Sequence, residues 1–402
     1  MKILLLTTWR LINAKGGAEK VFCDMANALT NRGHEVTAVC VDKNQGSPGF
    51  PLDRNVNLLN IYQNAVPLPL RPLPIKLQAF LHWTQAKRKS KKEELTDLSI
   101  AHKLRSALLA QKFDIAVAFQ VRSCLILRTV FDDTLPIATM LHNVPNSYFN
   151  EQTPQRHFEI GHATDIVQVL RPEYTRELRA FLPEANIAYI PNSVPQVQET
   201  AELAAKKIIN VARISQEKQQ LLLIEAFGLL NNEFPDWTIE LWGETNYKPN
   251  LTKKLMHKIV ASGLNERFTL CGTTNHIKEK LLSASIFAFP SKHEGFPLAL
   301  TEAMSLGLPA VGCKDCSGVN TLIKDGKNGL LCDPTAESLA EALRKLMRDQ
   351  DLRRRLGAQA KEDMKEFAPE RVWDQWEDLL TELVEKHRKH GLPIMTKPCG
   401  AI

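Results

Sequence analysis

Residues 286–304 read IFAFPSKHEGFPLALTEAM, and this stretch predicts a buried strand, a tight loop and the start of a helix. The apolar run from Ile286 to Phe289 stops at Pro290. Pro297 has the fixed φ of a first helical position, and apolar residues then recur at helical spacing. A strand that leads through a glycine loop into a helix N-terminus favours anions, because free N–H groups and the helix dipole both attract negative charge.

Two carboxylates frame this predicted anion site. The free N–H groups are expected around Gly295, Phe296 and Leu298, while Glu294 lies in the loop and Glu302 lies inside the helix. A carboxylate accepts two hydrogen bonds, so it suits a diol better than a phosphate. The stretch therefore predicts a ligand with phosphate in the middle and hydroxyl groups on either side, as in a nucleotide sugar. Either glutamate taken alone would better suit a solvated surface position, and it is the whole arrangement of loop, proline, helix start and two acids that favours a ligand site.

Glu294 and Glu302 form an E-x7-E motif, and the sequence around them resembles the retaining glycosyltransferases of family 4, which have the GT-B fold. The resemblance lies in Pro-Ser-x-x-Glu-Gly-Phe-Pro-Leu followed by Glu-Ala-Met-x-x-Gly-x-Pro. It implies that Glu294 contacts the transferred sugar, that Glu302 contacts the ribose, and that the anomeric configuration is retained. Pro297 stands where many family members carry glycine.

Composition sets the broad class of protein. The 402 residues suit two domains, each large enough for its own core. A net charge of +6 permits an acidic ligand or an anionic surface without requiring either. No apolar stretch has the length of a membrane span or a secretion signal, so we expect a cytoplasmic protein that could act at the inner face of the cell membrane. Cys313-x-x-Cys316 is a lone pair, which predicts free thiols rather than a metal or redox site.

The first half opens as a βαβ unit, with strands at 3–8 and 36–41 and a helix at 18–32. The G-x-G-x-x-G fingerprint is absent, which argues against a dehydrogenase. The family resemblance implies that Gly17, at the helix start, approaches the donor diphosphate or the acceptor. A plain strand-to-helix turn is the alternative interpretation of this glycine.

The first half also contains a histidine at a strand end and a basic stretch, both of which could bind a ligand or a surface. His142 follows the predicted strand at 136–141, and open α/β sheets bind ligands at such strand ends. The resemblance places a similar histidine beside the donor sugar and acceptor, and a structural histidine is the alternative. Lys76 to Lys92 predicts a basic, partly aromatic helix that suits either an anionic membrane surface or a solvated helix end. Nucleic acid is not expected, because no other basic and aromatic stretch follows.

The second half adds cations at a strand end. Arg213 and Lys218 follow the predicted strand at 208–212, where a fork of donors and a mobile ammonium suit a diphosphate. The resemblance assigns both to the donor phosphates, and two surface charges are the alternative. It also implies that the ends of two further strands, at Gly243 and Gly272, hold the base, without distinguishing uracil from guanine or adenine.

Together these observations predict an α/β protein with two Rossmann-like domains facing across a cleft. The expected parts are an acceptor-side domain (1–195), a nucleotide-sugar domain (196–370), a C-terminal helix that packs back on the first domain (371–388) and a tail (389–402). Glu294, His142, Arg213 and Lys218 are the predicted catalytic residues.

The predicted reaction moves a hexose or N-acetylhexosamine from a nucleotide diphosphate sugar, with UDP favoured, to a hydroxyl of a glycan or glycolipid acceptor. Cell-surface polysaccharide, lipopolysaccharide or lipid-linked oligosaccharide synthesis is the expected setting. No cofactor or metal is expected, because the two cations already oppose the diphosphate charge. A GT-B nucleotide-sugar epimerase and a non-catalytic nucleotide-sugar-binding protein stay open as alternatives.

Overall fold

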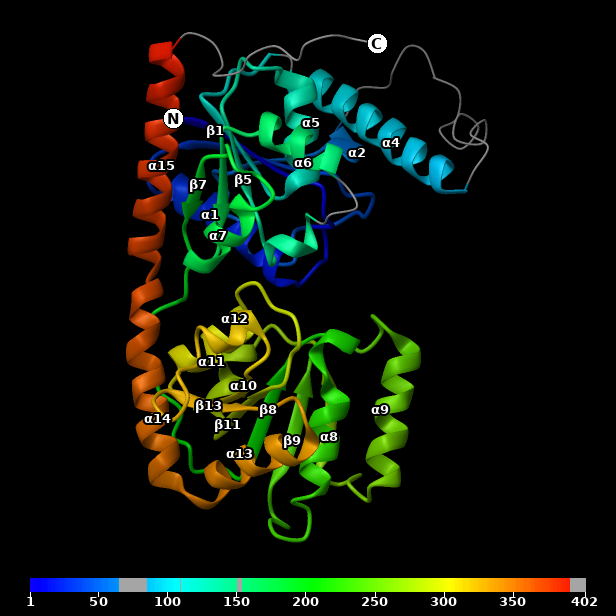
Figure 1. Cartoon of the computed structure of the whole chain (residues 1–402), viewed down its shortest axis with the longest axis vertical. Coiled ribbons are helices and arrows are strands. Elements are labelled where there is room, and N and C mark those ends of the chain that lie inside the picture. The colour runs from blue at the N-terminus through cyan, green and yellow to red at the C-terminus, as the bar shows by residue number, and fades with distance from the viewer. Residues whose placement is uncertain (65–84, 109, 150–153, 391–402) are drawn as a thin grey trace. The chain divides into compact units, whose positions relative to one another are not determined.

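The computed structural model describes residues 1–64, 85–108, 110–149 and 154–390. The chain divides into two compact units (Figure 1). The first unit comprises Met1–Pro191 together with the chain from Trp373 onward, and the second comprises Asn192–Val372.

The first unit is built on a sheet whose described strands all run parallel, in the order β3-β2-β1-β4-β5-β6-β7. Its central strands are buried on both faces and accordingly read as continuous apolar runs. The elements are β1 Lys2–Thr7, α1 Gly17–Asn31, β2 Glu35–Cys40, β3 Asn57–Asn60, α2 Ile61–Asn64, α4 Gln85–Leu108, β4 Ile115–Ala118, α5 Val121–Phe131, β5 Ile137–Met140, η1 Pro145–Ser147, α6 Pro154–Ala163, β6 Ile166–Val169, α7 Pro172–Arg179 and β7 Ile187–Tyr189.

The second unit repeats this plan with parallel strands in the order β10-β9-β8-β11-β12-β13. Its elements are β8 Lys207–Val211, η2 Gln216–Lys218, α8 Gln220–Gly228, β9 Thr238–Trp242, α9 Pro249–Ala261, β10 Phe268–Gly272, α10 Ile277–Leu282, β11 Ile286–Phe289, α11 Leu298–Ser305, β12 Ala310–Cys313, α12 Ser317–Asn320, β13 Gly329–Cys332, α13 Ala336–Arg348, α14 Gln350–Asp363 and η3 Met364–Phe367. The prediction of two Rossmann-like parallel sheets is confirmed.

Each sheet has one point at which the strand order reverses. In the first unit β2 and β4 flank β1, and in the second unit β9 and β11 flank β8. Right-handed crossovers on the two sides of such a strand place their helices on opposite faces of the sheet. The loops on the two sides then diverge at the carboxyl ends of the strands and leave room for a ligand. In the second unit this point lies between β8 and β11.

The last helix, α15, spans Pro369–His390 and is predominantly part of the first unit (Figure 1). Arg32 donates to Asp374 at 2.7 Å, His34 lies 3.0 Å from Glu377, and Arg388 donates to Asp114 at 2.7 Å. Exposed ion pairs contribute little, so most of the stabilisation comes from the buried stripe of the helix. That stripe comprises Trp373, Trp376, Leu380, Leu383 and Val384.

The structure differs from one sequence-based expectation, and two others fall wholly or partly outside the described residues. Helix α11 begins at Leu298, so Pro297 occupies the N-cap and not the first helical position. The predicted basic helix at Lys76–Lys92 lies outside the described residues over 76–84, and the backbone from Gln85 onward is helical as part of α4. The predicted tail lies outside the described residues from 391 onward. Every helix in the described part of the chain is too short or too polar to span a bilayer.

Replacing Trp376 by alanine tests the packing of α15. The side chain is only 1% exposed, and truncating a buried tryptophan to alanine typically costs about 3–5 kcal/mol. We expect a loss of that size in the free energy of unfolding, measured by urea titration with far-ultraviolet circular dichroism. Glu385→Ala, at an exposed position of the same helix, serves as the control. A loss below about 1 kcal/mol for Trp376→Ala would contradict the role given to this helix.

Candidate active site

The strand ends of the second unit bring two distant segments together. β8 and β11 are adjacent parallel strands, and the turn η2 follows the first while the loop to α11 follows the second. The backbone N–H of Lys292 donates to the carbonyl of Glu217 at 2.8 Å, which ties that loop directly to η2. The predicted cations Arg213 and Lys218 and the predicted carboxylate Glu294 therefore lie on neighbouring loops, at the place where the strand order reverses.

Lys218 and Glu294 form an ion pair at this place. The Nζ atom of Lys218 donates to Oε1 of Glu294, and the two side chains are only 18% and 11% exposed. The same ammonium lies 5.8 Å from the ring centroid of Phe289, the last residue of β11. Because both charges are largely removed from water, each depends on the other for compensation.

Gly318, near the start of α12, holds the loop that carries Glu294. A Cβ atom at position 318 would lie 2.3 Å from the carbonyl oxygen of Glu294 and 2.8 Å from its Cβ, closer than any side chain permits. The backbone of α12 therefore rests directly on the loop. Sequence reasoning missed this glycine, because nothing in the surrounding residues indicates which segment it contacts.

The N-terminus of α11 keeps its amides uncapped, since Pro297 at the N-cap provides no side-chain hydrogen bond. Gly295 and Phe296 are buried, and the ring of Phe296 packs edge-on against Phe367 with centroids 5.2 Å apart. The Phe296 side chain thus anchors the loop and only its backbone is left for a ligand. Leu298 is the first helical residue.

Glu302 lies in the second turn of α11 and is half-buried. The uncapped N-terminus of α11 therefore lies between the two glutamates of the motif in the sequence. Glu294 comes before it, in the loop, and Glu302 comes after it, in the helix. Its contact with a ribose stays a prediction.

Arg213 is exposed just after β8 and stacks on an aromatic ring. Its guanidinium carbon lies 4.7 Å from the ring centroid of Tyr247, and Nζ of Lys248 lies 5.5 Å from the same ring. A contact with the face of the ring uses none of the N–H donors of the guanidinium as ordinary hydrogen bonds, so these donors are left for a ligand. Tyr247 and Lys248 escaped sequence analysis, because their loop follows β9 and carries no motif.

Two glycines close the neighbouring strand ends. The N–H of Gly243 donates to the carbonyl of Gly272 at 2.7 Å, and both residues have positive φ, +151° and +71°. A Cβ at position 243 would lie 2.1 Å from the carbonyl oxygen of Ala212, immediately before Arg213. Glycine is thus required at 243 for the close approach of the β8 and β9 ends. The predicted contact of Gly243 and Gly272 with a base stays a prediction.

His142 lies after β5 in the first unit, inside an aromatic cage. Its ring stacks on Phe119 at 5.4 Å and lies 5.3 Å from Trp9, while its backbone N–H donates to the hydroxyl of Tyr148 at 3.2 Å. The Nε2 atom is enclosed and has no hydrogen-bond partner within the described residues. Burial lowers the pKa of His142 to about 4. The imidazole is therefore neutral at pH 7.

Gly17 is the exposed first residue of α1, after the N-cap residue Gly16. The loop that leads to it is fixed by Asp42, which sequence reasoning missed. This carboxylate is 3% exposed and accepts the N–H groups of Leu11 and Ile12 at 2.9 and 2.8 Å. Gly17 and His142 belong to the first unit, so their part in the site of the second unit stays a prediction.

Cys313, Cys316 and Cys332 carry free thiols. Burial raises the pKa of Cys316 to about 11, so this thiol is protonated and unreactive at neutral pH. The sequence also contains one Asp-x-Asp, Asp349-Gln350-Asp351. Asp349 caps α14 by accepting the N–H of Leu352 at 2.8 Å, which gives this motif a structural role. The expectation of a metal-independent reaction therefore rests on the cations alone.

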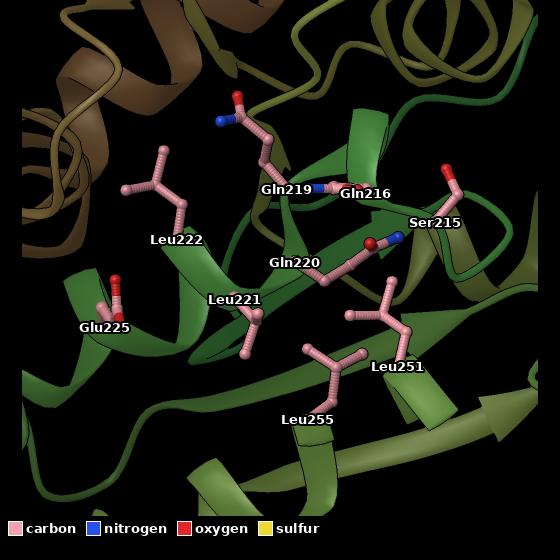
Figure 2. A pocket seen from close by; sticks show the side chains of 9 residues that line it. All are labelled: Ser215, Gln216, Gln219, Gln220, Leu221, Leu222, Glu225, Leu251 and Leu255. Atoms are coloured by element: carbon pink, nitrogen blue, oxygen red, sulfur yellow. The ribbon is translucent and has the colours of Figure 1, made fainter. Parts of the chain in front are cut away.

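A hollow of about 270 Å³ lies between α8 and α9, next to the turn that carries Lys218. Figure 2 shows leucine side chains from both helices beside the side chain of Gln220, whose Nε2 donates to the carbonyl of Arg213 at 3.1 Å. The hollow is lined by Ser215, Gln216, Gln219, Gln220, Leu221, Leu222, Glu225, Leu251 and Leu255. Arg213, Lys218 and Glu294 are not among its lining residues, so the hollow is separate from the ion-paired site.

Residues 196–363 match the family model described as glycosyl transferases group 1. This range contains Arg213, Lys218, Glu294 and Glu302. All four charged candidate residues of the second unit therefore lie within the matched range. The first unit lies outside the match.

Relatives extend the similarity over most of the chain. A glycosyltransferase of amylovoran biosynthesis from Erwinia amylovora is 24% identical over 92% of this chain and 97% of its own length. An exopolysaccharide phosphotransferase of Streptomyces coelicolor is 28% identical over 96% of this chain. This chain spans only 41% of that longer relative.

Among solved structures, HepE of Anabaena in complex with UDP-glucose superposes with a TM-score of 0.71 and 18% identity, over 95% of this chain and all of that one. The likeness shows that the chain has the GT-B fold. The family match and the Erwinia relative, which is named a glycosyltransferase, support the prediction that the protein is an enzyme that transfers glycosyl groups.

Gly318→Ala tests the support of the Glu294 loop. The added methyl group must displace the Glu294 backbone, because the carbonyl oxygen lies 2.3 Å from its position. We expect this overpacking to lower the free energy of unfolding by about 1–3 kcal/mol, measured by urea titration. Gly228→Ala, at a helical glycine with open space around its Cβ position, serves as the control. Unchanged stability in Gly318→Ala would show that the loop does not depend on this contact.

His142 should make stability depend on pH. The pKa of His142 is about 4 in the folded protein and about 6.5 in the unfolded chain. Between these two pH values the imidazole is protonated in the unfolded chain and neutral in the folded protein. Stability from this residue is complete above pH 6.5 and is lost as pH falls toward 4. Between pH 7.5 and 4.5 we expect wild type to lose about 2–3 kcal/mol more than His142→Phe.

The measurement is urea unfolding at both pH values. The exposed residue His276 provides the matched variant His276→Phe, which should keep the wild-type pH dependence. Equal losses in wild type and His142→Phe would show that the caged imidazole does not resist protonation.

Proposed function

We propose that this protein is a retaining glycosyltransferase that moves a hexose or N-acetylhexosamine from a UDP sugar to an acceptor hydroxyl. The observation that carries the proposal is the Lys218–Glu294 pair, held between the ends of β8 and β11 beside the uncapped N-terminus of α11. A cation, a hydrogen-bond acceptor and free backbone amides at one strand reversal match the parts of a nucleotide sugar.

The leaving diphosphate is the group that most needs stabilisation in this reaction. Arg213 presents the edge of its guanidinium, Lys218 presents an ammonium, and the first turn of α11 presents N–H groups with the positive end of its dipole. Donors that are fixed before the reaction stabilise developing charge by several kcal/mol when water is excluded. These groups therefore supply the leaving-group stabilisation without a metal.

Glu294 has a second task in this scheme. As long as it pairs with Lys218, its carboxylate holds the ammonium against the loop that leads into α11. A diphosphate that takes over Lys218 would release the carboxylate oxygens to accept hydrogen bonds from the hydroxyl groups of the sugar. Glu302, further along α11, is the proposed acceptor for the ribose hydroxyls. Retention of configuration rests on the family resemblance.

The setting is inferred from the relatives. One relative is named an exopolysaccharide phosphotransferase and another is named for amylovoran biosynthesis, and HepE was solved with UDP-glucose. These names support cell-surface polysaccharide synthesis, with a UDP sugar as donor and a growing glycan or glycolipid as acceptor. Lipopolysaccharide and lipid-linked oligosaccharides are chemically similar acceptors. We place the reaction in the cytoplasm, where nucleotide sugars are available.

The donor prediction is tested by thermal shift of the purified protein with UDP, GDP, ADP and NAD in parallel. A ligand at about 100 times its dissociation constant stabilises the folded state by roughly 2.7 kcal/mol. We expect this shift with UDP. A shift with GDP or ADP alone would overturn the choice of base, and a shift with NAD alone would overturn the glycosyltransferase assignment.

Two substitutions then separate the roles of the site residues. Arg213→Ala should lower kcat about 100-fold, since it removes a donor to the leaving group. Glu302→Ala should raise the dissociation constant for UDP about tenfold, since a hydrogen bond to a charged group is worth about 1.5–3 kcal/mol. Arg354→Ala, an exposed arginine on α14, is the control. Normal kinetics and binding in both site variants would refute the assignment.

A further inference from the structure

The backbone at Arg213 is fixed on every side. Its carbonyl accepts Nε2 of Gln220 at 3.1 Å, and Gln220 is only 1% exposed. Main-chain hydrogen bonds to the end of β9 flank it on both sides, from Ala212 to Trp242 at 2.9 Å and from Ile214 to Glu244 at 3.1 Å. The freedom that is left to Arg213 is therefore the freedom of its side chain.

The side chain of Arg213 is limited by one aromatic ring. Arg213 is exposed, and within the described part of the chain it forms no ion pair with an acid. Its guanidinium carbon lies 4.7 Å from the ring centroid of Tyr247. A long, exposed side chain without such a contact exchanges between several rotamers, and ordering it costs entropy. The ring of Tyr247 therefore restricts the positions that the guanidinium can take.

Tyr247 itself stands on a fixed segment between β9 and α9. Oγ1 of Thr252, in the first turn of α9, donates to the carbonyl of Thr245 at 2.5 Å. The backbone N–H of the same Thr252 donates to the carbonyl of Lys248 at 3.1 Å. The chain is thus fastened on both sides of Tyr247, whose side chain is left 43% exposed at the surface.

The two candidate cations of the site are held in different ways. Lys218 pairs with the carboxylate of Glu294, so a diphosphate that takes over the ammonium must displace an acid. Arg213 lies against a neutral ring instead. A diphosphate can reach its N–H donors without displacing a charged group, so the orientation of Arg213 before binding acts directly on affinity.

We propose that Tyr247 is a positioning residue for Arg213, and that its ring holds the guanidinium ready for the diphosphate before the donor arrives. A donor group that is ordered in advance loses less entropy when the ligand binds. The inference rests on the proposed function, because it needs a nucleoside diphosphate at this strand end. It adds that a residue from a neighbouring strand end sets how well the arginine binds that ligand.

The test compares UDP with uridine, which lacks the phosphates. Tyr247→Leu removes the ring, so we expect the dissociation constant for UDP to rise about three- to tenfold, which is the cost of immobilising one long side chain. The dissociation constant for uridine should stay within about twofold of wild type. Tyr247→Phe keeps the ring and should bind both ligands like wild type. Isothermal titration measures UDP, and ligand-observed NMR measures uridine.

Tyr62→Leu is the matched control. Nζ of Lys103 lies 4.6 Å from the ring centroid of Tyr62, so this variant also removes a ring that contacts a cation, but in the first unit. It should leave UDP binding unchanged.

A double variant shows whether Tyr247 acts through the arginine. In the Arg213→Ala background, Tyr247→Leu should weaken UDP binding by less than about twofold, because no guanidinium is left to hold. An equal loss in both backgrounds would overturn the inference, since Tyr247 would then act through Lys248 or touch the donor itself. An equal loss for uridine, or unchanged UDP binding in Tyr247→Leu, would overturn it as well. A wild-type protein that binds no nucleoside diphosphate would instead refute the proposed function.

Discussion

The pairing of Lys218 with Glu294 is the constraint on which the second unit's site depends. It joins the turn after β8 to the loop after β11, at the only place in that sheet where neighbouring connections diverge within the described residues. Both side chains are largely buried, so neither charge can leave its partner without compensation from another group. A diphosphate is such a group for the lysine, and sugar hydroxyls are such groups for the carboxylate. The ion pair thereby holds the two loops together until a ligand of complementary charge replaces the contact between Lys218 and Glu294.

Much of this arrangement was predictable from the sequence because it is local. The strand, loop and helix around Glu294 are encoded by a continuous apolar run, a glycine and a proline, and only the position of Pro297 differed by one residue. Arg213 and Lys218 were recognisable because they follow a buried strand. The parallel sheets follow from short apolar strands that alternate with helices.

The residues that sequence reasoning missed act through contacts between distant segments. Gly318 supports Glu294 from the start of helix α12, Tyr247 contacts Arg213 from the end of a different strand, and Asp42 fixes a loop some thirty residues earlier. None of them has a local pattern that differs from an ordinary turn residue. His142 illustrates a related limit, since its position at a strand end was predictable, whereas its enclosure by Trp9 and Phe119 depends on three separate loops.

The path of the chain through α15 has a consequence for biosynthesis. The first unit needs the residues from Trp373 onward, yet the whole second unit, Asn192–Val372, is translated before them. Domains usually fold as they emerge from the ribosome. Here the first sheet must wait for its last helix with the surface that receives Trp376 and Leu380 still exposed, so the first part of the chain to be made is the last to be completed. Premature termination within the last helix would therefore damage the N-terminal half of the protein.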